Sequence, residues 1–155
     1  AAWLDNHKWG LRSSDGGSSY SNFRWAPLGE WTEAPDWNPE PVCGGGLHLE
    51  TPECHGFRIQ YWRAELVEYS GEAIPIDKDK AKVKRARIVA IGIDIPKEAW
   101  ERCGYKVARD GETISPRQGD YYVILDGHVN LVNPQGGMFF TGGNLWHVAD
   151  PRSGI

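Results

Sequence analysis

Prolines limit the secondary structure that residues 25–57 can form; they are Pro27, Pro35, Pro39, Pro41 and Pro52. Proline lacks a backbone N–H group and its ring clashes with the preceding helical turn, so a long helix is excluded here. Trp31 and Trp37 lie in the same stretch, and their large rings gain free energy when they are buried. We therefore predict a long irregular loop, held over one face of the fold by its tryptophans and prolines.

The composition of the whole chain favours short strands. The 155 residues include 19 glycines and 10 prolines, which is typical of strands joined by turns rather than of a helical bundle. This length suits one domain with a single core. We predict a β-rich α+β fold, with a small mixed or antiparallel sheet, one short helix and the long loop.

Three segments carry clear element patterns. Residues 57–69 alternate apolar and polar side chains with a slip at Tyr61 and Trp62, which predicts a strand with a bulge, although the same segment would also suit a short helix. Residues 82–93 give the clearest strand pattern, with alternating faces. A short helix is expected at 96–103, because Pro96 suits its first turn and Gly104 its end.

The second half contains a hairpin pattern. Two apolar runs within residues 121–132 flank Asp126 and Gly127, a pair that suits a two-residue turn with positive φ. We predict an antiparallel hairpin here. We find no internal repeat in the sequence.

The first 22 residues look separate from the rest. Residues 10–22 are rich in glycine and serine and predict a flexible linker, so we expect residues 1–22 to form a lead-in arm and residues 23–155 a single globular domain. Trp3 and Trp9 lie in the arm and should dock either on their own domain or on a second copy of the chain. Self-association is therefore one expected mode of interaction.

The charges are unevenly distributed. Residues 77–87 hold six basic and two acidic side chains, whereas the whole chain carries a net charge of −4. Three alternatives remain open for this basic run: a solvated or edge strand, which we favour, contact with nucleic acid, or pairing with the acidic loop of the chain itself. No apolar run approaches 18 residues, so we expect no membrane span.

Zinc-competent side chains gather within 13 residues; they are Cys43, His48, Cys54 and His55. Thiolate and imidazole are the ligands zinc prefers. Because the adjacent Cys54 and His55 rarely bind the same ion, a full tetrahedral site could use only one of them, with Cys103 or His147 as the fourth ligand. The alternative is structural: a buried Cys43, and a His48 that is hydrogen-bonded to the backbone inside a glycine turn. An odd count of three cysteines favours reduced thiols over disulfides, hence a cytoplasmic location.

Parts of residues 23–93 resemble a known family. The segments FRW at 23–25, EAPDWNPEPVCGGGLH at 33–48 and KVKRARIVAIG at 82–92 are similar to a family of small uncharacterised bacterial and phage proteins. The resemblance implies a shared fold unit but no activity. Cys54 and His55 stand where members of that family carry a different stretch, which weakens the zinc hypothesis.

A more distant resemblance is to mono-ADP-ribosyltransferases, in the order of an early arginine, a glycine turn followed by histidine, and later strands. It implies that NAD would be held by Arg24 and His48. Glu65 or Glu68 would be the catalytic glutamate. The chain lacks the paired acidic motif that usually accompanies that glutamate.

These observations lead to one functional expectation and two alternatives. We expect a non-catalytic accessory or interaction module of bacterial or phage origin, a component of a larger assembly, with a protein partner rather than nucleic acid. The first alternative is an NAD-using transferase, and the second is a small zinc-stabilised binding domain.

Overall fold

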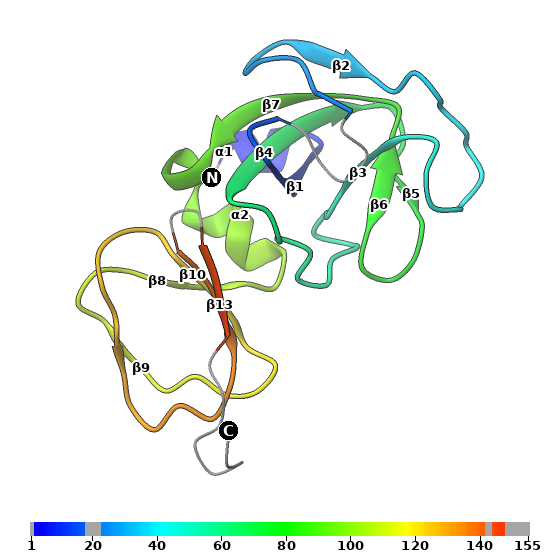
Figure 1. Cartoon of the computed structure of the whole chain (residues 1–155). Helices are drawn as coiled ribbons and strands as arrows, with labels where there is room; N and C mark the ends of the chain where they lie inside the picture. The colour runs from blue at the N-terminus through cyan, green and yellow to red at the C-terminus, as the bar shows by residue number, and fades with distance from the viewer. Residues whose placement is uncertain (1, 18–22, 142–143, 148–155) are drawn as a thin grey trace.

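The computed structural model describes the backbone of residues 2–17, 23–141 and 144–147 (Figure 1). Strands dominate it, and its helices are short, which confirms the predicted β-rich α+β fold. Figure 1 shows an upper part that carries β1 to β7 and a lower part that carries β8 to β13. None of the helices in the described ranges is long and apolar enough to cross a membrane.

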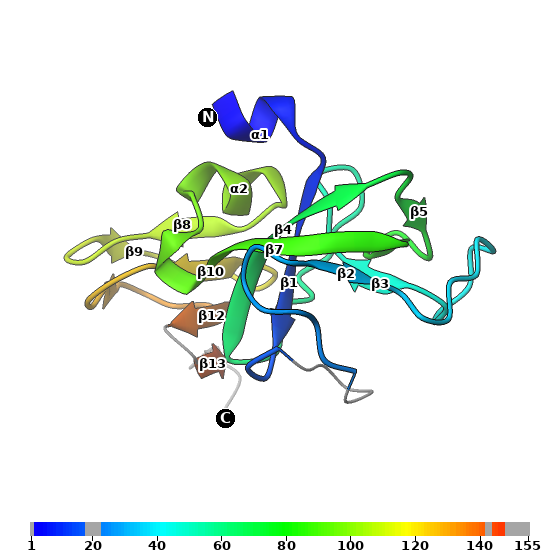
Figure 2. The same cartoon turned by 90° about the horizontal axis from the view of Figure 1, so that it is seen from above.

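The upper part contains a four-stranded antiparallel sheet in the order β1-β4-β7-β2. Its strands are β1 (Trp9–Ser14), β4 (Arg63–Ser70), β7 (Arg85–Ile91) and β2 (Trp31–Glu33). A smaller antiparallel sheet has the order β3-β6-β5, formed by β3 (Leu47–Leu49), β6 (Ala81–Val83) and β5 (Ile74–Pro75). Figure 2 shows the smaller sheet and the lower part on opposite sides of β1 and β4.

The strand predicted at residues 82–93 is divided between the two sheets. The chain leaves the smaller sheet at β6 and enters the larger one at β7, and Lys84 between them accepts a hydrogen bond on its carbonyl from the Ala34 amide (2.8 Å). The bulge also differs from the prediction, because the register shift lies between Leu66 and Val67. Residues 57–62 form no strand, because several of their backbone amides donate hydrogen bonds to the side chains of Glu50 and Ser13.

Residues 9–14 are a buried strand, which corrects the predicted linker. Every residue of β1 is buried, and the strand pairs in register with β4. Gly10 is needed for packing, because a Cβ there would lie 2.2 Å from Cδ1 of Leu49. The hydroxyl groups of Ser13 and Ser14 are both hydrogen-bonded. The small residues of this segment therefore serve close approach between strands, whereas we had expected them to confer flexibility.

The segment before β1 also belongs to the main core. Helix α1 (Ala2–Asn6), which the sequence analysis missed, contributes the buried Leu4, and Trp9 donates from its indole Nε1 to the Leu4 carbonyl (3.0 Å). Both side chains pack in one apolar cluster with Trp100. Trp9 therefore docks on the domain of its own chain. The expected boundary after residue 22 lies next to residues 18–22, outside the described ranges.

The short helix was predicted correctly. Helix α2 (Lys97–Arg102) starts after Pro96, ends before Gly104, whose φ is +85°, and buries Ala99 and Trp100. A single 3-10 turn, η1 (Gly92–Asp94), links it to β7. The helix lies where the upper and lower parts meet (Figure 1).

The lower part is a coil of parallel strands, and the predicted hairpin at 121–132 is absent. β10 (Tyr121–Ile124) pairs in parallel with β8 (Lys106–Ala108) on one side and with β12 (Met138–Thr141) on the other. β9 (Thr113–Ile114) and β11 (Asn130–Leu131) form a second parallel pair, and β13 (Asn144–His147) lies antiparallel to β12. Paired residues such as Lys106 and Tyr122 lie 16 or 17 positions apart. This is a structural repeat that the sequence analysis did not find.

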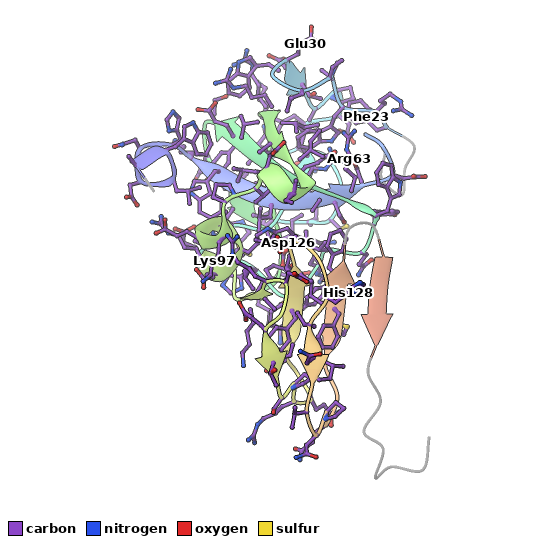
Figure 3. All side chains as sticks on the ribbon, turned by 90° about the vertical axis from the view of Figure 1, so that its left-hand side faces the viewer. Phe23, Glu30, Arg63, Lys97, Asp126 and His128 are labelled. Atoms are coloured by element: carbon purple, nitrogen blue, oxygen red, sulfur yellow. The ribbon has the colours of Figure 1, made fainter. Side chains whose placement is uncertain are left out.

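Contacts between successive turns of the coil explain why the hairpin does not form. The Asp126 carboxylate accepts the Asp110 amide (3.3 Å), and the Asp110 carboxylate accepts the His128 amide (2.8 Å). Figure 3 labels Asp126 and His128 on this part of the chain. The Asp126-Gly127 turn therefore binds the preceding turn of the coil and does not close a pair of adjacent strands. The coil is fixed to the upper part through Tyr105, Tyr121 and Phe140, which belong to the main core.

We expect Gly127→Val to lower the free energy of unfolding by about 1–3 kcal/mol. Gly127 has the predicted positive φ, +64°, and an added Cβ would lie 2.0 Å from Oδ1 of Asp110. Gly111→Val is the matched control, because φ there is +83° and no atom lies within 4 Å of the added Cβ. Urea unfolding of both variants measures the difference, and equal losses would contradict the role of the Asp110 contact.

Candidate functional site

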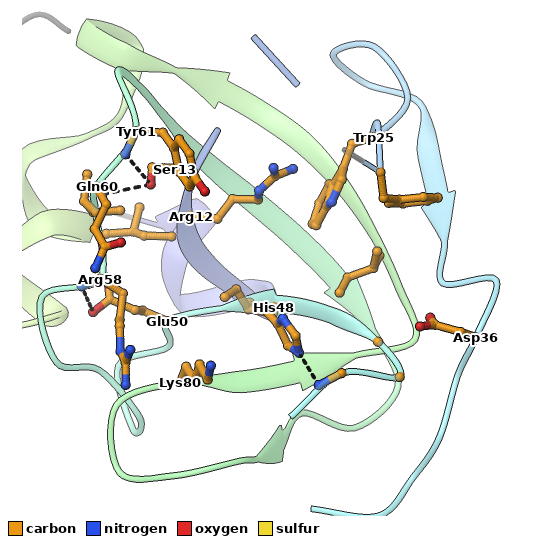
Figure 4. Close-up of a pocket in the computed structure, with 18 of the residues that line it drawn as sticks. Arg12, Ser13, Trp25, Asp36, His48, Glu50, Arg58, Gln60, Tyr61 and Lys80 are labelled. Atoms are coloured by element: carbon orange, nitrogen blue, oxygen red, sulfur yellow. Dashed lines mark hydrogen bonds between the residues drawn. The ribbon is translucent and has the colours of Figure 1, made fainter. Parts of the chain in front are cut away.

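A cleft of about 600 Å³ opens in the upper part between β1, β3 and the loops around them (Figure 4). β1 contacts the chain just after β3, where the amides and carbonyls of Leu11 and Glu50 exchange two hydrogen bonds of 2.8 Å. The lining combines aromatic rings with charged groups, and its charged and imidazole side chains are Arg12, Asp36, His48, Glu50, Arg58 and Lys80.

One wall of the cleft is held by Ser13. Its hydroxyl oxygen accepts the backbone amides of Gln60 (3.0 Å) and Tyr61 (3.1 Å), as Figure 4 shows. These two bonds tie the loop at residues 58–61 to β1. The cleft therefore has a fixed wall, although this loop forms no strand.

Arg12 is the most unusual residue of the lining. Its side chain is 5% exposed, and its guanidinium lies 4.0 Å from the centre of the Trp25 ring. Nη1 lies 3.2 Å from Oε1 of Glu65, close enough for an ion pair, yet neither Nη1, Nη2 nor that oxygen has a hydrogen-bond partner among the described residues. Burial lowers the pKa of Arg12 to about 10, against the opposing effect of the Glu65 charge.

Two arginines share the Glu65 carboxylate. Oε2 of Glu65 accepts the Ser14 hydroxyl (2.6 Å) and Nε of Arg63 (2.6 Å), whereas Oε1 faces Arg12. The carboxylate is 0% exposed. Two guanidinium charges therefore lie next to one carboxylate, of which that of Arg12 is buried and that of Arg63 is 21% exposed.

Glu50 anchors the same wall, through the part of the loop that precedes Gln60. Oε1 accepts the amides of Gly56 (2.9 Å) and Arg58 (3.1 Å), and Oε2 accepts the hydroxyl of Tyr105. Burial raises the pKa of Glu50, and these three hydrogen bonds oppose the rise. The hydroxyl of Tyr121 donates to the Ile59 carbonyl (2.6 Å), so the lower part also holds this wall.

His48 lies inside a glycine turn, as the structural alternative predicted. Its Nε2 accepts the Gly44 amide (3.3 Å). Lys82, which is 0% exposed, donates to the carbonyls of Val42 (3.1 Å) and Gly44 (3.0 Å). Burial lowers the pKa of His48, and the charges of Lys80 and Lys82 add to this effect.

The remaining candidate zinc ligands point to other partners. Cys43 is exposed, contrary to the structural alternative, and its Sγ lies 3.6 Å from Nζ of Lys80. Cys54 is buried and donates to the Asp77 carbonyl (3.1 Å), and His55 lies beside Gly104. Cys103 is fully buried in the main core. Within the described ranges no three His, Cys, Asp or Glu side chains converge as metal ligands, so these residues do not support the zinc hypothesis. The His147 side chain lies outside the description.

The residues expected for NAD chemistry do not meet in the cleft. Of the four, only His48 is part of its lining. Arg24 is exposed and donates to the Gly16 carbonyl (2.8 Å). Glu65 is buried between Arg12 and Arg63, and Glu68 accepts Nε of Arg87 (2.7 Å).

Two arginines of the basic run pair with the acids of the chain itself. Arg85 and Arg87 lie over the Trp31 ring, at 4.1 and 5.0 Å from its centre. Arg85 forms an ion pair with Glu33 (3.4 Å) and Arg87 one with Glu68 (2.7 Å). The pair of Arg85 with Glu33 is the contact with the acidic loop that was one of three alternatives, whereas Glu68 lies in β4, outside that loop.

Comparison with known proteins adds no family: no family model, curated protein or solved structure is significantly similar to this chain. The resemblances described from the sequence therefore stay predictions.

We expect His48→Ala to lower the melting temperature at pH 7.5, because the Gly44 amide loses its acceptor, at a cost of about 1 kcal/mol. The folded pKa of His48 lies below 6.5, so the unfolded chain takes up the proton first on acidification. The wild type should thus lose this contribution as the pH falls below about 6.5, and the gap between wild type and variant should narrow.

Thermal melts at pH 7.5 and pH 5 measure this gap, with His128→Ala, an exposed histidine, as the control. A gap that stays constant with pH would contradict the burial of a neutral imidazole. Metal analysis of the same samples tests the zinc hypothesis. Stoichiometric zinc in the wild type that is lost in His48→Ala would support that hypothesis.

Proposed function

We propose that the protein is a non-catalytic interaction module, which binds an exposed segment of a partner protein in the cleft and serves a larger assembly. A volume of about 600 Å³ lies within the usual range for ligand pockets. Phe23, Trp25 and Tyr61 offer apolar contact, while charged groups beside them offer specificity.

The observation that supports a binding role is how two acid–base groups of the lining, His48 and Glu50, are used. The Nε2 lone pair of His48 is taken by the Gly44 amide, and both oxygens of Glu50 accept fold-maintaining hydrogen bonds. A general acid or base needs a free atom within reach of a substrate proton. These two side chains instead keep the walls of the cleft in place, and a preformed site binds with little cost of reorganisation.

Selection of peptides from a phage-displayed random library on the folded protein tests the proposal. Gln60→Trp places a large ring at an exposed position of the lining, and Gln118→Trp makes the same change at an exposed position outside it. We expect selected peptides to bind the wild type and the Gln118→Trp variant alike. Gln60→Trp should weaken binding at least tenfold.

Two outcomes would overturn the proposal. The first is that no peptide is selected, or that every selected peptide binds the Gln60→Trp variant as well as the wild type. The second is calorimetric binding of NAD that Gln60→Trp abolishes, since this would favour the transferase alternative for the same cleft.

A further inference from the structure

Two nitrogens of the Arg12 guanidinium, Nη1 and Nη2, have no hydrogen-bond partner among the residues that the structure describes. Buried polar groups in folded proteins are nearly always paired, and an unpaired buried donor costs free energy. Nη1 and Nη2 are both shielded from water without a hydrogen-bond partner among the described residues. The residue nonetheless lines the cleft. Such a group is available to a ligand that brings its own acceptors.

The geometry around Arg12 restricts what that ligand can be. The guanidinium is planar, so the N–H groups of Nη1 and Nη2 lie in its plane, and the Trp25 ring lies over it at 4.0 Å. Figure 4 shows Arg12 extending from β1 toward Trp25, with Ser13 and Tyr61 on its other side. The N–H groups of a guanidinium form a fork that matches the two oxygens of a carboxylate.

The charge of the site favours the same ligand. Arg12 and Arg63 share the single carboxylate of Glu65; Arg63 is 21% exposed to water, whereas Arg12 is only 5% exposed, so the charge of Arg12 is only partly compensated in a buried position. An anion that replaces water near such a charge gains more than it would at the surface, because the local dielectric constant is low.

We infer that the cleft recognises a carboxylate on the bound segment, either an Asp or Glu side chain or the carboxyl terminus, which pairs with Nη1 and Nη2 of Arg12. This inference rests on the proposed function, in which the cleft binds a partner segment. Trp25 lies outside the strands, and its amide is bonded to the Gly17 carbonyl (3.0 Å). Because this ring covers the guanidinium in the free protein, the inference requires the Trp25 side chain to move when the carboxylate enters, while the wall held by Ser13 and Glu50 stays in place.

Peptides selected on the wild type provide the probes. Each is synthesised with its carboxylates replaced one at a time, Asp by Asn, Glu by Gln, and the free terminus by an amide. We expect one replacement to weaken calorimetric binding at least tenfold, and its position identifies the source of the carboxylate. Arg12→Gln should weaken binding of the parent peptide by a similar factor. It should not further weaken binding of the peptide whose recognised carboxylate has been replaced by an amide, because the two changes remove the same interaction.

Arg85→Gln is the matched control, because Arg85 also lies over a tryptophan ring, at 4.1 Å from the centre of Trp31, but outside the cleft. It should leave binding unchanged. Arg12→Lys keeps the charge and removes the fork, so we expect an intermediate loss, and this variant serves if Arg12→Gln does not fold.

The outcomes separate this inference from the proposed function. If every amide peptide binds as tightly as its parent, or if both Arg12 variants bind like the wild type, the inference is wrong, although Gln60→Trp still blocks the cleft. If Gln60→Trp has no effect either, the cleft is not the binding site and both proposals fail.

Discussion

Glu50→Ala is expected to lower the free energy of unfolding by about 3–5 kcal/mol, because the buried Glu50 carboxylate serves three donors at once. The amides of Gly56 and Arg58 and the hydroxyl of Tyr105 would all lose their acceptor. Glu50 is 1% exposed, so water does not readily replace the lost oxygens. Urea unfolding followed by circular dichroism measures the loss.

Two conservative variants isolate the origin of this effect. Glu50→Gln keeps an oxygen for the two backbone amides and should cost about 1 kcal/mol. Tyr105→Phe removes only the third donor and should cost a similar amount. If Glu50→Ala is no more costly than Glu50→Gln, the carboxylate does not hold the wall of the cleft.

Local patterns in the sequence were sufficient to predict elements whose ends are set by residues close to them in the chain. Pro96 and Gly104 bracket α2, and both act within one helical turn of it. The alternation in residues 85–91 also predicted a strand correctly. These features depend on residues a few positions apart, so a single sequence contains the information.

The arrangement of the coil could not be predicted in the same way. Asp126 and Gly127 suit a two-residue turn, and Gly127 does have positive φ. Whether such a turn closes a hairpin depends on contacts with another turn of chain, here the bond from the Asp110 amide to the Asp126 carboxylate. The strands are two to four residues long, which is too short for their apolar pattern to distinguish parallel from antiparallel pairing.

The candidate site was predicted only in part for a related reason. His48 was found because a glycine turn and neighbouring cysteines drew attention to it. Arg12 lies in a segment rich in glycine and serine, and Glu50 lies in an acidic loop, so both look solvent-exposed in the sequence. Their burial results from distant partners, Glu65 for Arg12 and Tyr105 for Glu50, which only the fold brings close.

Deletion of residues 1–12 is expected to abolish folding. The deletion removes three buried side chains of the main core, Leu4, Trp9 and Leu11, together with most of the strand that pairs with β4. Large-to-small changes at single core positions cost about 2–5 kcal/mol, and a domain of this size is stable by only about 5–15 kcal/mol. Far-UV circular dichroism and the dispersion of amide NMR signals report the result.

Point variants separate the loss of the Trp9 ring from the loss of the backbone. Trp9→Ala should cost about 3–5 kcal/mol, since its side chain lies in the core. Trp62→Ala is the matched control: this indole is also hydrogen-bonded, to Asp15, but Trp62 is 51% exposed, so the loss should stay within about 0.5 kcal/mol. A truncated chain that stays folded as a monomer would show that β1 is dispensable and would support the arm that we predicted from the sequence. An unfolded product, together with a large loss of unfolding free energy for Trp9→Ala alone, means that residues 1–12 belong to the main core. That core also holds β1, the strand that carries Arg12 into the cleft.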